Sequence, residues 1–212
     1  MSKSDILRKL EEKKTKDEEL VEEAIKNREF LHALLHGISS SNPRIKFRSA
    51  KILRTVSERN PKMLYSDWKF FAKLLESENN ILKWNAMDII ANLTQVDSNS
   101  RFNGLFKKFY SYLYEESLIT AGHVVDNSGT IALAKPEFQD KITKELLKVE
   151  EIPLPTEECR NILIGKTIQA FDMYIDRTNN KDEIVSFVKR QLNNTRKATK
   201  AKAEKFLRKL KR

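Results

Sequence analysis

The 212-residue sequence has few of the residues that interrupt helices or cross-link chains: five glycines, five prolines and one cysteine, Cys159. Because glycine and proline destabilise helix interiors, their scarcity leaves room for many helices and disfavours a strand-rich fold. A single cysteine excludes a disulfide within the chain, which fits a reducing compartment. No apolar run approaches the ~20 residues that a membrane-spanning helix needs, and residues 1–14 lack the apolar stretch of a signal peptide. The composition predicts a soluble, cytoplasmic protein with an all-α fold.

The positive charge is confined to one end of the sequence. Residues 186–212 contain eleven Lys or Arg and one acidic residue, Glu204, and so account for the whole formal net charge of +10. The preceding residues are balanced, with 29 basic and 29 acidic side chains. The basic character therefore describes the C-terminal segment and not the body of the protein.

A segment of twenty residues recurs after 37 residues: NPRIKFRSAKILRTVSERNP at 42–61 is followed by NNILKWNAMDIIANLTQVDS at 79–98. Asn42 corresponds to Asn79, and the matched apolar positions are Ile45 with Leu82, Ile52 and Leu53 with Ile89 and Ile90, and Val56 with Leu93. A shared apolar pattern at this period is typical of stacked helix pairs.

Helical spacing and helix-breaking residues divide the rest of the chain into similar units. We expect an N-terminal helical extension over residues 1–26, for which partial disorder is one alternative, and a repeat domain over 27–212. The predicted two-helix units span 27–60, 61–98, 99–135, 136–178 and 179–212. Thr15 and Glu18 match a capping box, and the chain is expected to break at Asn27. Gly122 and Gly129, inside one predicted helix, indicate close approach of a neighbouring helix.

The tandem two-helix units, the Asn before the second helix and the NPRIKFRSAKIL and NNILKWNAMDII pattern resemble HEAT repeats of the armadillo/HEAT superfamily. The resemblance covers about residues 27–212. It implies a right-handed α-α superhelix, a HEAT-like solenoid of about five two-helix repeats. HEAT proteins are mostly scaffolds and adaptors, so the resemblance also implies a non-enzymatic protein that binds a macromolecular partner.

A solenoid lines its second helices along one concave face, which is usually the binding face. Removing the predicted core positions leaves a polar stripe on that face: Arg44, Arg48, Lys51, Thr55, Asn85, Asp88, Asn92, Gln95, His123, Asp126, Thr130, Asn161, Gln169, Asp172, Arg196 and Lys200. This groove would be basic at both ends and polar-acidic in the middle. It predicts a protein segment of mixed charge as partner, and an ordinary solvated face is the alternative.

The last predicted helix combines an apolar stripe, including Ala203 and Phe206, with a basic patch at Arg196, Lys197, Lys200, Arg208 and Lys209. The apolar stripe indicates that the helix docks on the body. The cations then have two interpretations. They give a terminal repeat its polar outer cap, or they bind an acidic partner such as phosphates of DNA, RNA or a membrane surface. A nucleic-acid-binding solenoid is therefore the alternative function.

The remaining candidates do not predict a catalytic, metal or cofactor site. His32 and His36 are spaced like a metal pair but lack a third ligand. His123 and Asp126 lie one helical turn apart, as residues often do by chance. Cys159 and the two tryptophans, Trp68 and Trp84, are expected in the core. A more distant alternative is a DNA-repair glycosylase-like enzyme, which would require Trp84 to point into the groove beside Asp88 or Asp126.

Overall fold

The computed structural model describes residues 3–12 and 14–211, which form helices joined by turns and loops, with no strand among them. The all-α prediction is therefore confirmed. The chain divides into two compact units, the first ending at Ser98 and the second beginning at Asn99. Among the described residues, no helix is long and apolar enough to cross a membrane.

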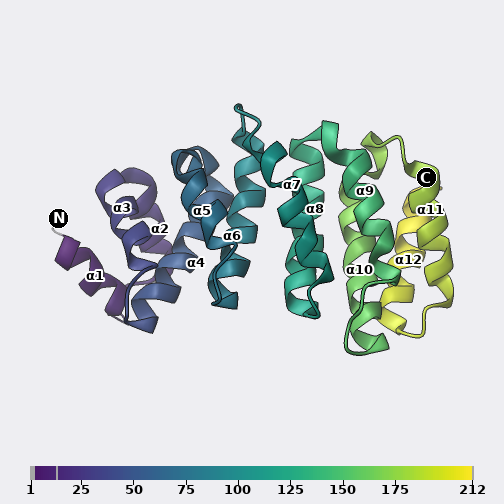
Figure 1. Ribbon diagram of the computed structural model, residues 1–212, viewed down its shortest axis with the longest axis horizontal. Coiled ribbons are helices and arrows are strands. Elements are labelled where there is room, and N and C mark those ends of the chain that lie inside the picture. Colours follow the sequence, from purple (N-terminus) through teal and green to yellow (C-terminus); the bar gives the residue numbers. More distant parts are fainter. Residues whose placement is uncertain (1–2, 13, 212) are drawn as a thin grey trace. The chain divides into compact units, whose positions relative to one another are not determined.

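The first unit contains six α-helices in its described part. They are α1 (Lys3–Glu11), α2 (Asp17–Lys26), α3 (Arg28–Gly37), α4 (Pro43–Arg59), α5 (Trp68–Leu74) and α6 (Asn80–Leu93) (Figure 1). Helix α4 packs against α3, its partner in the pair, and against α6 of the next pair. The recurring asparagines begin the second helices: the Asn42 side chain accepts a hydrogen bond from the Arg44 N–H, and Asn79 accepts one from the Leu82 N–H. The repeated motif thus sets where α4 and α6 start.

Helices α1 and α2 pack on the first helix pair, since both contact α3 and α4. Their apolar side chains Ile6, Leu10, Leu20, Val21 and Ala24 are buried there. The predicted break at Asn27 is confirmed, because its side chain caps α3 by accepting from the N–H groups of Glu29 and Phe30.

The predicted capping box at Thr15 is wrong. Helix α2 begins at Asp17, and its N-cap, Lys16, makes no capping hydrogen bond with its side chain. The Glu18 carboxylate bonds instead to both Nη atoms of Arg59, at 2.5 and 2.8 Å. A guanidinium at the far end of α4 therefore competes successfully for the carboxylate that the local pattern assigned to the cap.

The second unit contains α7 (Arg101–Ser111), α8 (Leu118–Ala134), α9 (Gln139–Leu147), α10 (Glu157–Tyr174), α11 (Lys181–Arg190) and α12 (Lys197–Lys209). Helix α10 packs between α8 and α12, so these three second helices lie side by side (Figure 1). Helix α9 contacts α8 and α11, and α11 contacts α12. The second unit is thus built as two layers of helices, with α8, α10 and α12 in one of them.

Short 3-10 helices extend or connect the α-helices. They are η1 (Pro61–Met63), η2 (Tyr65–Asp67), η3 (Thr94–Val96), η4 (Tyr112–Tyr114), η5 (Pro136–Phe138), η6 (Lys148–Glu150), η7 (Ile175–Arg177) and η8 (Gln191–Asn193). Pro61 and Pro136 each occupy the first position of one, where a missing N–H costs no hydrogen bond.

Two glycines bring the second helices of this unit into close contact. A Cβ atom on Gly129 of α8 would overlap the sulfur of Met173 on α10 and lie 3.2 Å from its Cβ. A Cβ on Gly165 of α10 would lie 2.8 Å from Thr199 Oγ1 on α12. At Gly122 the nearest atom, Lys166 Cε, is 3.5 Å away, which is ordinary contact. The predicted close approach is therefore confirmed at Gly129, whereas Gly122 has room for a methyl group.

Candidate interaction surface

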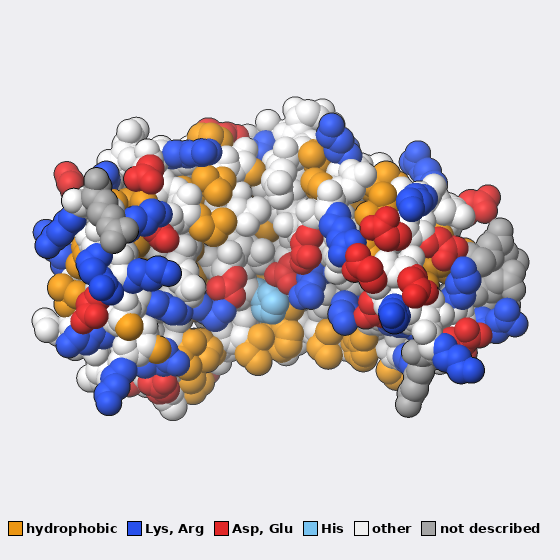
Figure 2. Space-filling model, turned by 180° about the vertical axis from the view of Figure 1, so that it is seen from behind, with side chains coloured by type: hydrophobic (Ala, Val, Ile, Leu, Met, Phe, Trp, Pro, Cys, Tyr) orange, Lys and Arg blue, Asp and Glu red, His pale blue; other side chains and the backbone are white. Residues whose placement is uncertain are grey.

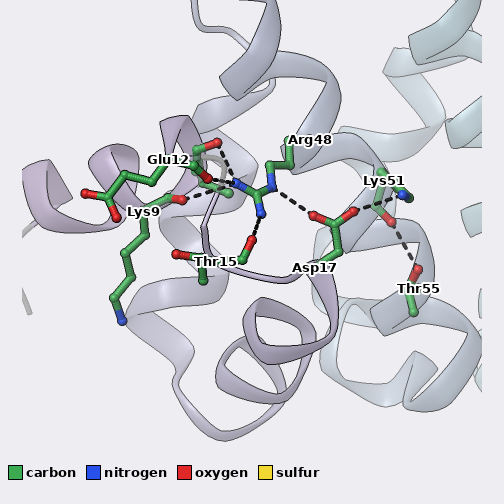
Figure 3. A network of polar contacts seen from close by, with 8 residues as sticks. Lys9, Glu12, Thr15, Asp17, Arg48, Lys51 and Thr55 are labelled. Atoms are coloured by element: carbon green, nitrogen blue, oxygen red, sulfur yellow. Dashed lines mark hydrogen bonds and ion pairs between the residues drawn. The ribbon is translucent and has the colours of Figure 1, made fainter.

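Arg48, the second residue of the predicted stripe, forms an ion pair and several hydrogen bonds within the first unit. Its Nε donates to Asp17 Oδ1 at 2.8 Å (Figure 3). Its Nη atoms donate to the backbone carbonyls of Lys9, Leu10, Glu12 and Thr15. Only 12% of the side chain is exposed. Arg48 therefore ties the end of α1 and the connection to α2 onto α4.

Lys51 completes this network, because its Nζ lies 2.9 Å from the other carboxylate oxygen of Asp17. Partial burial raises the pKa of Asp17, but the hydrogen bonds and charges of Lys51 and Arg48 outweigh it and hold the pKa below its ordinary value. The Thr55 hydroxyl donates to the carbonyl of Lys51 at 3.3 Å. Arg44, the other predicted stripe residue on α4, is exposed, and its side chain makes no such contact within residues 3–12 and 14–211.

The predicted residues on α6 also bond within the first unit. Asp88, with 17% of its side chain exposed, lies 3.4 Å from Arg54 Nη1 on α4. Asn92 donates to the Ser57 hydroxyl on α4 at 2.9 Å. Asn85 donates to the carbonyl of Ile81 in its own helix at 2.7 Å, and Gln95, which lies beyond α6 in η3, is exposed. Two of these four side chains thus hold α6 against α4.

Stripe residues link the second helices of the second unit in the same way. Asp126 on α8 forms an ion pair with Lys166 on α10. Asn161 on α10 is 7% exposed, and it donates to Thr195 Oγ1 and accepts from Asn194 Nδ2, both at 2.9 Å. His123 and Thr130 are half-buried. Asn161 is therefore a buried bridge to the start of α12 and not an open contact residue.

A groove of about 660 Å³ lies between α10 and α12. Its lining residues are Ile168, Gln169, Asp172, Met173, Lys202, Lys205, Phe206, Arg208 and Lys209. Gln169 and Asp172 belong to the predicted stripe, and Arg208 and Lys209 to the predicted basic patch. The structure thus brings parts of the two predicted surfaces together. Lys202, Lys205 and Met173, which complete the groove, were not predicted as site residues.

The groove combines an apolar floor with a basic edge. Ile168 and Phe206 are buried beneath it, whereas 46% of Met173 is exposed. Lys209 Nζ lies 2.8 Å from Asp172 Oδ1, and Lys202 Nζ donates to Gln169 Oε1 at 2.6 Å. Among the described residues, Lys205 and Arg208 have no carboxylate at ion-pair distance. At the edge formed by α12, Lys and Arg side chains outnumber acidic ones (Figure 2).

The pKa of Lys202 is lowered, first by its partial burial and then by the positive charges of Arg196 and Lys166, with Asp126 opposing the shift. Burial is thus the main cost of charging Lys202, and the repulsion from Arg196 and Lys166 adds to it. An anionic group bound here would relieve that repulsion.

The predicted basic patch is divided between different faces of α12. Arg208 and Lys209 line the groove, and Arg196 Nε lies 2.8 Å from Glu158 Oε1. Lys197 and Lys200 are exposed. Because each residue of an α-helix is turned by 100° from the one before, these two side chains lie on the side of α12 away from Lys202 and Lys209. Only part of the patch can therefore contact a ligand in the groove.

The other candidates are not among the lining residues of this groove. His32 and His36 are exposed on α3, Cys159 is half-buried at the start of α10, and Trp84 is half-buried on α6. The expected burial holds for Trp68, which is 4% exposed. Within the described ranges, no group of three or more His, Cys, Asp or Glu side chains is arranged to hold a metal ion.

Comparison with known proteins informs the fold alone. No family model matches the sequence, and no curated protein matches it. One similar solved structure is a crystal structure of an engineered protein from the Northeast Structural Genomics Consortium, with a TM-score of 0.56 and 14% sequence identity. The match covers 100% of this chain and 97% of that one. The arrangement of helices therefore has a counterpart of nearly the same extent in a protein of different sequence.

Proposed function

We propose that this chain is a HEAT-like solenoid that acts as a non-enzymatic scaffold and binds a protein partner. The five helix pairs would form one right-handed superhelix, with α4, α6, α8, α10 and α12 on its binding face. The groove between α10 and α12 would be the main contact. The composition of this groove carries the proposal. An exposed apolar side chain, Met173, lies there beside two cations, Lys205 and Arg208, that have no carboxylate partner in the described part of the chain.

The recurring helix pairs support the architectural part of the proposal. Four of the proposed second helices begin at a polar side chain that caps them: Asn42, Asn79, Ser117 and Thr156 precede α4, α6, α8 and α10, whereas Arg196 before α12 makes no capping bond with its side chain. Side chains on one second helix bond to the next at similar sequence separations, 34 residues for Arg54 with Asp88 and 40 for Lys166 with Asp126. A regular offset of this kind is what stacked repeats produce.

Nucleic acid is a second candidate partner, favoured by Lys197 and Lys200. These cations are exposed and, within the described part of the chain, have no carboxylate partner. Phosphates would bind there without using the apolar floor of the groove. If about five phosphates are contacted, the logarithm of the binding constant should fall with the logarithm of salt concentration with a slope of roughly −4 to −5. Binding that does not depend on salt would exclude this candidate.

Affinity purification from a lysate of the source organism, with and without nuclease, tests the proposed function. A scaffold should retain specific proteins after nuclease treatment, whereas loss of every retained protein would favour nucleic acid. Reversal of Lys197 and Lys200 to Glu separates the two candidates further. It should abolish retention of nucleic acid and leave retention of a protein bound in the groove unchanged.

A further inference from the structure

We propose that the groove between α10 and α12 binds a short, acidic, amphipathic helix of a partner protein. The apolar face of that helix would lie on Met173, and its carboxylates would lie against Lys205 and Arg208. This inference rests on the proposed scaffold function and specifies its partner. It follows from the size, the charge and the floor of the groove.

The groove is short. Its lining residues span 168–173 on α10 and 202–209 on α12. At 1.5 Å per residue, the eight positions on α12 extend over roughly 12 Å, which is about two helical turns. A docked helix would therefore use one or two apolar anchors spaced three or four residues apart.

The charge of the lining selects an acidic occupant. Four cations line the groove against one carboxylate, Asp172, and that carboxylate already pairs with Lys209. Lys202 is held by the Gln169 amide oxygen. Lys205 and Arg208 lie one turn apart on α12 and pair with no carboxylate among the described residues, although Arg208 Nε donates to the Glu204 carbonyl at 3.4 Å. Carboxylates one turn apart on a docked helix would match them, and the like charge of a basic segment would be repelled.

The floor of the groove favours a protein segment over a nucleic acid. Met173 is the exposed apolar side chain there, and methionine adapts its shape to apolar partners. Its side chain also packs against Gly129 of α8, where a larger residue would overlap it. Phe206, the one aromatic residue of the lining, is only 3% exposed. Bases therefore have no aromatic surface to stack on, which is what single-stranded nucleic acid sites usually provide.

Labelled synthetic peptides test the inference with the full chain. The first probe is a peptide of Leu, Glu and Ala about 14 residues long, with Leu and Glu on adjacent stripes of one helix. The second has the same composition in scrambled order, and the third is a single-stranded DNA of equal charge. Fluorescence anisotropy should show the amphipathic peptide binding at least about ten-fold more tightly than the scrambled one. Equal binding of the two peptides, or tighter binding of the DNA, would overturn the inference.

Paired variants localise the binding. Lys205→Glu with Arg208→Glu should weaken binding of the amphipathic peptide by about ten-fold or more, since charges that contact the ligand are reversed. Lys197→Glu with Lys200→Glu changes the net charge equally at the N-terminal end of α12, before the first groove residue Lys202, and should weaken binding by less than about three-fold at moderate salt. Met173→Ser should weaken binding by about ten-fold without changing the charge. If both double reversals weaken binding equally, the peptide is held by general electrostatic attraction and the groove is not its site.

The same variants separate this inference from the proposed function. If the groove reversal still retains nuclease-resistant proteins from lysate as the unmodified chain does, the scaffold function stands and the groove is not its contact surface. If the unmodified chain retains no protein after nuclease treatment, the scaffold function itself fails. Circular dichroism and urea denaturation of each variant confirm that a loss of binding does not reflect unfolding.

Discussion

The basic residues of α4 and those of α12 look alike in the sequence but are used differently. On α4, Arg48 and Lys51 share the carboxylate of Asp17, and Arg48 also donates to four backbone carbonyls. On α12, Lys205 and Arg208 line a groove and, among the described residues, find no carboxylate. The first set holds the N-terminal helices in place, whereas the second remains available to a ligand. A cation thus indicates a binding surface only after its intramolecular partners are known.

The pKa shifts express the same contrast. Asp17 and Lys202 both have a lowered pKa, but the charged form is favoured for Asp17 and disfavoured for Lys202. At neutral pH, the charge of Asp17 therefore stabilises its unit, whereas the charge of Lys202 is disfavoured by partial burial and then by the repulsion of Arg196 and Lys166. An anion bound beside these cations would reduce their mutual repulsion, so its binding is electrostatically favourable.

The largest effect is expected on replacing Arg48 by Met. The change would leave the Asp17 carboxylate without one partner and four carbonyls without a donor, so the free energy of unfolding should fall by about 2–4 kcal/mol. Urea denaturation followed by circular dichroism measures it. Arg44→Met removes an exposed cation from the same helix and should change the stability by less than about 0.5 kcal/mol. Equal effects of the two substitutions would refute the structural role of Arg48.

A smaller effect, with opposite signs at two sites, is expected from replacing glycines by alanine. Gly129→Ala gains about 1 kcal/mol of helix propensity, but overpacking against Met173 costs about 1–3 kcal/mol, so a net loss near 1 kcal/mol is expected. Around Gly104 on α7, no described atom beyond the neighbouring residues and backbone of its own helix lies within 4 Å of an added Cβ, so Gly104→Ala should stabilise the protein by about 0.5–1 kcal/mol. A stabilising Gly129→Ala substitution would show that Met173 is not held by this contact.

Local features of the fold were predictable because they depend on neighbouring residues. Asn42 and Asn79 cap α4 and α6 as their repeat indicated, and Asn27 interrupts the chain because its side chain caps α3. The capping box at Thr15 failed because the competing partner of Glu18, Arg59, lies 41 residues away. No local pattern reports a contact at that separation.

The candidate surface was predictable only in part, for a similar reason. Helical spacing placed Asp88, Asp126 and Asp172 among the polar positions of the second helices, but it could not show that each bonds to a neighbouring helix. Those pairings depend on the offset between helices, which packing determines. Met173 was missed because only polar side chains were assigned to the stripe, although it follows Gln169 by four residues and so stands on the same face of α10. The glycine at position 129 predicted close approach of a neighbouring helix, and this is the sequence feature that could have indicated a contact with α10 near Met173.

The pH dependence of Asp17 provides a test of modest size. A carboxyl group whose folded pKa is lowered contributes stability that is complete above its unfolded pKa, about 3.9, and is lost as the pH falls through the lower folded value. Asp17→Asn should therefore reduce the stability at pH 7 by up to about 1 kcal/mol, since the ion pairs are partly exposed. The difference from the unmodified protein should shrink as denaturation is measured at pH values approaching 3. A difference that persists unchanged in acid would mean that the charge of Asp17 does not contribute.

The smallest effect is expected at Lys202. Removing the charge of Asp17 should lower the stability, whereas removing the charge of Lys202 should raise it slightly. Because its folded pKa is lowered, stability should rise as the pH increases from that value to the unfolded value of about 10.4. Lys202→Met removes the cationic form that is disfavoured at pH 7, and a methionine fits beside the apolar floor. The variant should be slightly more stable than the unmodified protein at pH 7 and low salt, as measured by urea denaturation. This advantage should diminish in 1 M salt, which screens the repulsion from Arg196 and Lys166 to a distance of about 3 Å. A variant that is less stable under all these conditions would show that the hydrogen bond to Gln169 outweighs the repulsion, and that the cations of α12 are as well compensated as those of α4.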